Sequence, residues 1–76
     1  MKNYVEIICK NEHTYKLLED YLKDEDYELV TYLNFNRIIV ICEDFQMASR
    51  VWDKVARVED MYSDIKIQEM EIKDLV

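Results

Sequence analysis

Few side chains in this sequence have the type and spacing that enzymatic chemistry would need. There is one histidine, His13, and the two serines, Ser49 and Ser63, lie far from it along the chain. Nucleophilic catalysis requires a nucleophile, a base and a group that orients the base. Because no spacing here indicates such a triad, we expect His13 to be a solvent-facing residue at the start of a helix. We also expect the protein not to be an enzyme.

The sequence offers equally little for a metal or a cofactor. Its two cysteines, Cys9 and Cys42, form no CxxC pair, and the single histidine rules out HxxxH spacing. The chain has no glycine, so Ca²⁺ loops with a central glycine and glycine-rich phosphate loops are excluded. We expect no metal and no cofactor. Both cysteines are predicted near the ends of adjacent central strands, as neighbouring buried thiols that act as small apolar groups.

Acidic side chains are the distinctive feature of the sequence. The formal net charge is −7, from 17 acids against 10 bases. Six of the acids fall within ten positions: Glu19, Asp20, Asp24, Glu25, Asp26 and Glu28. The helix dipole disfavours negative charge at the end of a helix, so acids at the predicted end of the first helix indicate that their charge has a use. The alternative is a solvated helix end. Two smaller acidic groups follow: Glu59, Asp60 and Asp64, and Glu69, Glu71 and Asp74.

This charge favours one kind of partner over others. Direct binding to DNA or RNA needs a basic stripe, which an acidic chain does not supply. An acidic surface suits a basic protein, including one that itself handles nucleic acid. Tyrosines beside charged groups are typical of protein interfaces. We therefore include Tyr21 and Tyr27, which lie within the acidic segment, in the predicted partner-binding site.

The hydrophobic periodicity predicts the elements that must position these residues. Strands are expected over residues 4–10, 27–33, 37–43 and 65–72, and helices over residues 12–25 and 44–62. Asn11 and Asp44 are the predicted helix caps, and residues 34–36 form the predicted turn. The alternation slips near Gln68, which indicates a bulge or an early end of the last strand.

The predicted order of elements, β-α-β-β-α-β, defines an α+β ferredoxin-like two-layer sandwich. We expect a single domain over residues 1–76. Its four-stranded antiparallel sheet has the order 4-1-3-2, with both helices on one face. Trp52 is expected in the core under the second helix.

The third strand is apolar on both faces, which indicates that something covers the face without helices. Ile39 and Ile41 point to one side, and Ile38, Val40 and Cys42 point to the other. We predict an interface for a homodimer or another partner at Tyr4, Ile8 and Tyr32. The alternative is a small patch shielded by the long side chains of Tyr32, Glu6 and Lys66.

The chain shows no sign of secretion or membrane insertion. No apolar run is long enough for a signal peptide or a membrane helix. Two cysteines are too few for a disulfide scaffold of the secreted type. The expected location is the cytoplasm.

Together, the element order, the length of 76 residues and the Asp24-Glu25-Asp26 cluster resemble small acidic ferredoxin-like proteins that phages encode against host defence, notably anti-CRISPR proteins. The resemblance lies in architecture and composition. No residue motif is shared, so no functional site of these proteins can be assigned to residues of this sequence. It implies a non-enzymatic inhibitor in the host cytoplasm whose carboxylates mimic nucleic-acid phosphates in a basic groove of the partner. The alternative is a homodimeric ferredoxin-like regulatory or assembly module that uses its open sheet face.

Overall fold

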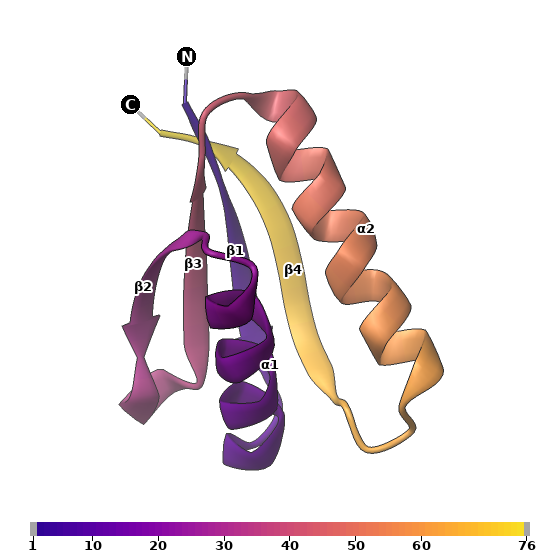
Figure 1. The fold of residues 1–76 in the computed structure, drawn as a ribbon. Coiled ribbons are helices and arrows are strands. Elements are labelled where there is room, and N and C mark those ends of the chain that lie inside the picture. Colours follow the sequence, from indigo (N-terminus) through magenta and orange to yellow (C-terminus); the bar gives the residue numbers. More distant parts are fainter. Residues whose placement is uncertain (1, 76) are drawn as a thin grey trace.

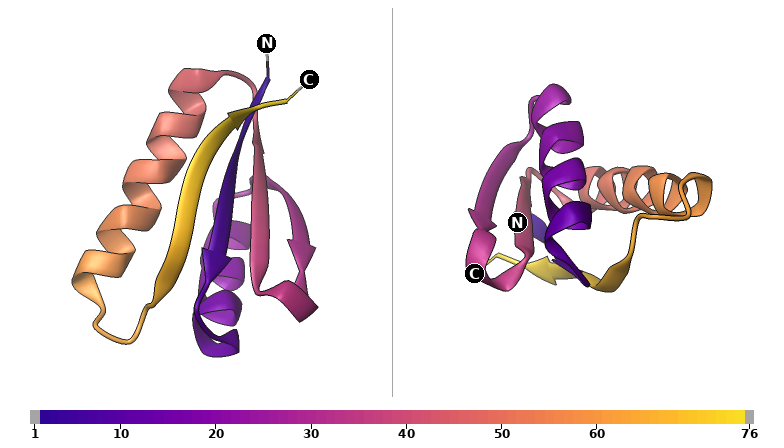
Figure 2. Two further views of the ribbon diagram at one scale, coloured as in Figure 1. Left: turned by 180° about the vertical axis from the view of Figure 1, so that it is seen from behind. Right: turned by 90° about the horizontal axis from the view of Figure 1, so that it is seen from below.

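Strands and helices alternate in the predicted order (Figure 1). The computed structural model describes residues 2–75. Its elements are β1 (Asn3–Cys9), α1 (Glu12–Asp24), β2 (Glu28–Tyr32), the 3₁₀ helix η1 (Leu33–Phe35), β3 (Arg37–Cys42), α2 (Phe45–Met61) and β4 (Ile67–Asp74). The strands form one antiparallel sheet in the order β2-β3-β1-β4, and both helices lie on one of its faces (Figure 2). The predicted ferredoxin-like layout is confirmed.

Local side-chain chemistry sets the element boundaries. The Oδ1 atoms of Asn11 and Asp44 accept the backbone N–H groups of Thr14 and Met47, each at 2.8 Å, so both predicted N-caps are confirmed. The turn before β3 depends on Asn36, whose φ is 51°. Asp26 takes the same left-handed conformation after α1, with φ at 61°. In a chain without glycine, Asn and Asp are the residues that adopt this conformation at least cost.

The predicted bulge lies in β4. Ile8 of β1 is opposite Glu69, whereas the next residue, Cys9, is opposite Ile67, which leaves Gln68 as the extra residue. Because side chains alternate along a strand, the extra residue allows both Ile67 and Met70 to face the helices. The strand continues to Asp74, so the alternative of an early end is wrong.

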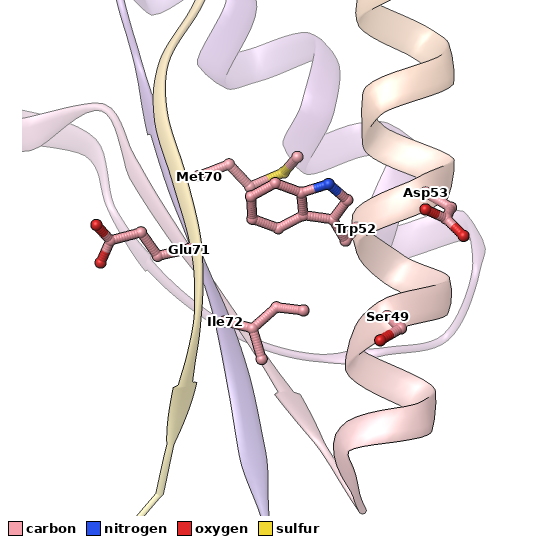
Figure 3. A pocket seen from close by; sticks show the side chains of 6 residues that line it. All are labelled: Ser49, Trp52, Asp53, Met70, Glu71 and Ile72. Carbon is pink, nitrogen blue, oxygen red and sulfur yellow. The ribbon is translucent and has the colours of Figure 1, made fainter.

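The core lies between the sheet and the two helices. Its largest fully buried aliphatic side chains are Val5, Ile7, Ile38 and Val40 from the central strands and Leu18, Leu22, Val51 and Val55 from the helices. Trp52 is not among the buried residues and is half-buried. It lies above β4, where it lines a hollow with Met70 and Ile72 (Figure 3). The expectation of a core tryptophan is therefore wrong.

The two cysteines are buried but are not neighbours. Cys42 is opposite Asn3, at the beginning of β1, whereas Cys9 is the last residue of that strand. Because β1 and β3 are antiparallel, the thiols lie at opposite ends of the sheet, about 20 Å apart along the strands. Burial raises the pKa of Cys9 to about 11 and also raises that of Cys42, with a smaller contribution from Asp44. Both are free thiols in the core, as expected, but their predicted proximity is wrong.

Candidate functional site

Acidic side chains gather at the end of the sheet where β1 begins. The register places Glu28 opposite Ile41, two positions before Glu43, and places Asp74 opposite Asn3. The end of α1 leads directly into this region. We call these residues the acidic end: Asp24, Glu25, Asp26, Glu28, Glu43, Asp44 and Asp74. Sequence reasoning missed Glu43 and Asp44 as members, although the predicted sheet order already places the end of β3 beside the start of β2.

The opposite end of the sheet carries basic residues. Lys10 follows β1, Arg37 begins β3 and Lys66 precedes β4. The backbone N–H of Lys10 donates to the carbonyl of Lys66 at 2.9 Å, which places these two residues side by side. The charges of the sheet are therefore distributed unevenly between its two ends.

Several predicted site residues are occupied by contacts within the protein. The Tyr15 hydroxyl donates to Glu19 at 3.1 Å, and Lys23 lies 3.6 Å from the same carboxylate. Lys54 Nζ of α2 lies 3.3 Å from Glu25 Oε2 and 3.2 Å from the Tyr27 hydroxyl. The pKa of Lys54 is raised, first by the Tyr27 hydroxyl and then by Glu25. Glu25 and Tyr27 are therefore already in contact with Lys54 of the same chain.

The other predicted residues belong to different surfaces. Asp20, Asp24 and Asp26 are exposed and form no ion pair within residues 2–75. Glu28 lies opposite Ile41 on the sheet face without helices. Tyr21 packs against the core and lines a groove between the helices. The eight predicted residues thus do not form one patch.

The open sheet face has a buried carboxylate at its centre. Glu6 forms ion pairs with Arg37 and with Lys73, whose Nζ is 2.9 Å from Glu6 Oε1. Lys73 first, and Arg37 after it, hold the pKa of Glu6 below its ordinary value against the effect of burial. The Arg37 guanidinium also lies 5.3 Å from the centroid of the Tyr32 ring. Long side chains therefore shield the middle of this face.

The predicted interface residues do face this open side of the sheet. Tyr4 is opposite Ile41, and both Ile8 and Tyr32 are opposite Arg37. The shielding side chains are Glu6, Arg37, Lys73 and Tyr32, and Lys66 is not among them because it precedes β4.

Sequence reasoning also missed Phe35 of η1. It is 72% exposed and lines a hollow of about 500 Å³ with Glu6, Ile8 and Arg37. Its position between two turn asparagines was the available signal, because an aromatic residue at such a turn has little access to the core.

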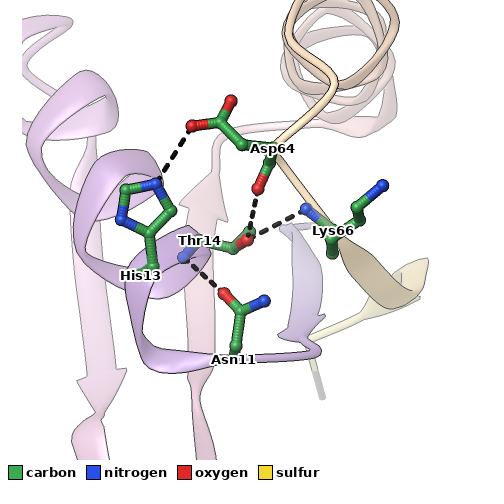
Figure 4. Close-up of polar contacts among 5 residues, drawn as sticks. All are labelled: Asn11, His13, Thr14, Asp64 and Lys66. Atoms are coloured by element: carbon green, nitrogen blue, oxygen red, sulfur yellow. Dashed lines mark hydrogen bonds and ion pairs between the residues drawn. The ribbon is translucent and has the colours of Figure 1, made fainter.

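Polar contacts around His13 join the start of α1 to the connection between α2 and β4 (Figure 4). His13 Nε2 lies 3.1 Å from Asp64 Oδ2, and both side chains are exposed. The contact with His13 lowers the pKa of Asp64. The buried Thr14 hydroxyl accepts the Lys66 N–H at 2.9 Å and donates to the Asp64 carbonyl at 3.4 Å. His13 is thus a helix-start residue, as predicted, and its observed partner is a carboxylate.

Comparisons with protein-family profiles, curated proteins and solved structures found no match to this chain. Within residues 2–75, no group of three or more His, Cys, Asp or Glu side chains is arranged to hold a metal ion. None of the helices described is long and apolar enough to cross a membrane.

Proposed function

We propose that this protein is a non-enzymatic inhibitor that occupies the basic nucleic-acid-binding surface of a partner protein. The observation that carries the proposal is the collection of carboxylates at the acidic end, contributed by the end of α1 and the turn after it, by β2, by the two residues after β3, and by β4. Phage-encoded anti-defence proteins that mimic nucleic acid would act in this way, in the host cytoplasm. Such a protein needs no cofactor and does not itself bind nucleic acid.

The mechanism is electrostatic competition. Carboxylates at the acidic end pair with the Lys and Arg side chains that would otherwise hold phosphates. Asp24, Asp26 and Glu28 provide the contacts, since their carboxylates form no ion pair within the described chain. Asp20 lies one helical turn before Asp24 on the exposed surface of α1 and extends the same charge. Binding of this kind weakens as salt screens the charges.

The test compares two variants with the same change in net charge. The first reverses or removes charge at the three carboxylates that provide the contacts: Asp24→Lys, Asp26→Asn and Glu28→Lys. Asparagine is used at position 26 because it tolerates the left-handed backbone there. The second variant carries Glu12→Lys, Asp53→Lys and Asp60→Asn, all at exposed positions on the two helices.

Both variants and the parent are immobilised and offered a nuclease-treated lysate at low and high salt. We expect the parent and the second variant to retain a partner that added DNA or RNA oligonucleotides displace, and the first variant to lose it. Equal retention by all three proteins, or capture that ignores both salt and oligonucleotide, would show that the acidic end is not the binding site.

A homodimer through the open sheet face is the second candidate. The observation that favours it is the exposed apolar surface beside that face: Val30, Tyr32, Leu33 and Phe35. It predicts a dimer at micromolar concentration that Phe35→Ser disrupts, as measured by light scattering. A parent protein that stays monomeric at these concentrations removes this candidate.

A further inference from the structure

The two helices leave an apolar groove between them. They diverge toward the end where α2 runs into the β4 connection (Figures 1 and 2). A groove of about 580 Å³ opens there, a volume within the range typical of small-molecule sites. Its apolar lining consists of Leu17, Tyr21, Val58, Met61, Tyr62 and Ile65.

Much of this lining is exposed to solvent. Met61 is 72% exposed, Tyr62 54% and Leu17 41%. A small protein has few large apolar side chains to bury in its core, and these three remain outside it. Leu17 and Tyr21 are one turn apart on α1, and Val58 and Met61 are spaced similarly on α2, so each helix presents a short apolar stripe to the groove. Contiguous apolar surface of this kind, enclosed on two sides, is typical of a ligand site.

The charges that line the groove differ in sign from the rest of the molecule. Two of its three charged residues, Lys54 and Arg57, are cationic in a protein of net charge −7. Lys54 is held by Tyr27 and Glu25. Arg57 is exposed and forms no ion pair within the described chain. The third residue, Asp64, is paired with His13. Arg57 is therefore the group left to receive an anion.

We propose that this groove binds a small amphipathic anion, of the chemical class of medium-chain carboxylates. The aliphatic chain lies against Leu17, Val58 and Met61, and the carboxylate pairs with the Arg57 guanidinium, which suits bidentate contact with a planar anion. The modest volume favours a single aliphatic chain over a protein segment. This site uses residues outside the acidic end and does not depend on the function proposed above.

The probes are three ten-carbon amphiphiles, used below their micellar concentrations: decanoate, decanol and decyltrimethylammonium. Binding is followed by amide chemical shifts in ¹H–¹⁵N spectra. We expect decanoate to bind most tightly, with its largest shifts on residues of the groove. Non-specific adsorption to an acidic protein would instead favour the cation. Equal binding of all three probes, preference for the cation, absence of binding, or shifts centred on the open sheet face would overturn the proposal.

Variants locate the head group. Arg57→Gln should weaken decanoate binding by about fivefold or more, through loss of a charge-assisted contact, and should change decanol binding little. Arg50→Gln removes another exposed arginine of α2, one that does not line the groove, and should leave both affinities unchanged. Equal effects of the two substitutions on decanoate would contradict the assignment. Thermal melts of both variants confirm that they are folded.

Discussion

Thr14 is a polar residue at a fully buried position. Its hydroxyl both accepts and donates a hydrogen bond across the junction between α1 and the β4 connection. Removing the hydroxyl leaves the Lys66 N–H without its partner. We therefore expect Thr14→Val to lower the free energy of unfolding by about 1–3 kcal/mol, the range for an unsatisfied buried group.

Thr14→Ser is the matched control, because it keeps the hydroxyl and loses one methyl group. It should cost about 1 kcal/mol. Both values come from urea denaturation monitored by circular dichroism. A valine variant as stable as the parent would show that water or a local rearrangement replaces the hydroxyl.

Glu6 makes the stability of the folded protein depend on pH in the acid range. Its pKa is lowered in the folded state by Lys73 and Arg37. The stability that it contributes is thus present above the ordinary glutamate pKa, near 4.5, and is lost as the pH falls through the lower folded value. We expect Glu6→Gln to destabilise the protein at neutral pH and to flatten the loss of stability between about pH 5 and pH 3.

Glu69→Gln serves as the control, because this carboxylate lies on the same face. Its pKa is raised, chiefly by the neighbouring Glu71, so its contribution to stability has the opposite sign and increases as the pH falls. The variant should retain the loss of stability in acid. Urea midpoints measured across this pH range distinguish the two variants, and identical profiles would argue against the role of Glu6.

At the scale of elements, the bulge in β4 keeps both parts of that strand facing the core. Inserting an alanine after Gln68 would place Gln68 opposite Cys9 and turn Ile67 to the open face of the sheet. We expect the insertion to lower the free energy of unfolding by about 1–3 kcal/mol through lost apolar burial. Gln68→Ala keeps the extra residue and should change stability by less than about 0.5 kcal/mol. Urea titration measures both, and an insertion that leaves stability unchanged would show that the position of Ile67 on the core face is dispensable.

Most of the element structure could be predicted because each segment carries its own local signal. The alternation of Val5, Ile7 and Cys9 identifies a strand, and Asn11 and Asp44 identify helix starts. Even the bulge was visible as a slip in the alternation. These features depend on neighbours in sequence, so the sequence alone determines them.

Tertiary placement was less accessible. Helical spacing indicates which side of α2 faces the sheet, but α2 extends over β4, and this leaves Trp52 half-buried at the edge. The contact of Lys54 with Glu25 and Tyr27 joins residues of two distant segments. No local pattern specifies such a pair. The candidate site was therefore predicted by composition, while the residues that are free to bind could be identified only in three dimensions.

At the scale of the whole molecule, like charges collected at one end of the sheet repel one another. Within the described chain, few bases accompany the acidic end, and one of them, Lys54, is already paired with Glu25. Adding salt to about 1 M reduces the Debye length to ~3 Å and screens this repulsion. We therefore expect the thermal midpoint of the parent to rise with salt.

The variant with Asp24→Lys, Asp26→Asn and Glu28→Lys should show a smaller rise, because it has lost much of the repulsion. Calorimetry at low and high salt measures both midpoints. If the parent melts at the same temperature in both conditions, the acidic end does not strain the fold, and its charge needs no functional explanation.

Because the two thiols lie at opposite ends of the sheet, their chemical labelling can report on local unfolding at each end of the native protein. Cys42 lies beside the acidic end, and Cys9 lies at the basic end, near the loop that closes the groove. An alkylating reagent reaches either sulfur only when the structure around it opens, so the two labelling rates report separately on breathing at the two ends. A macromolecule held at the acidic end should slow modification of Cys42 alone, whereas a small amphiphile between the helices should protect Cys9.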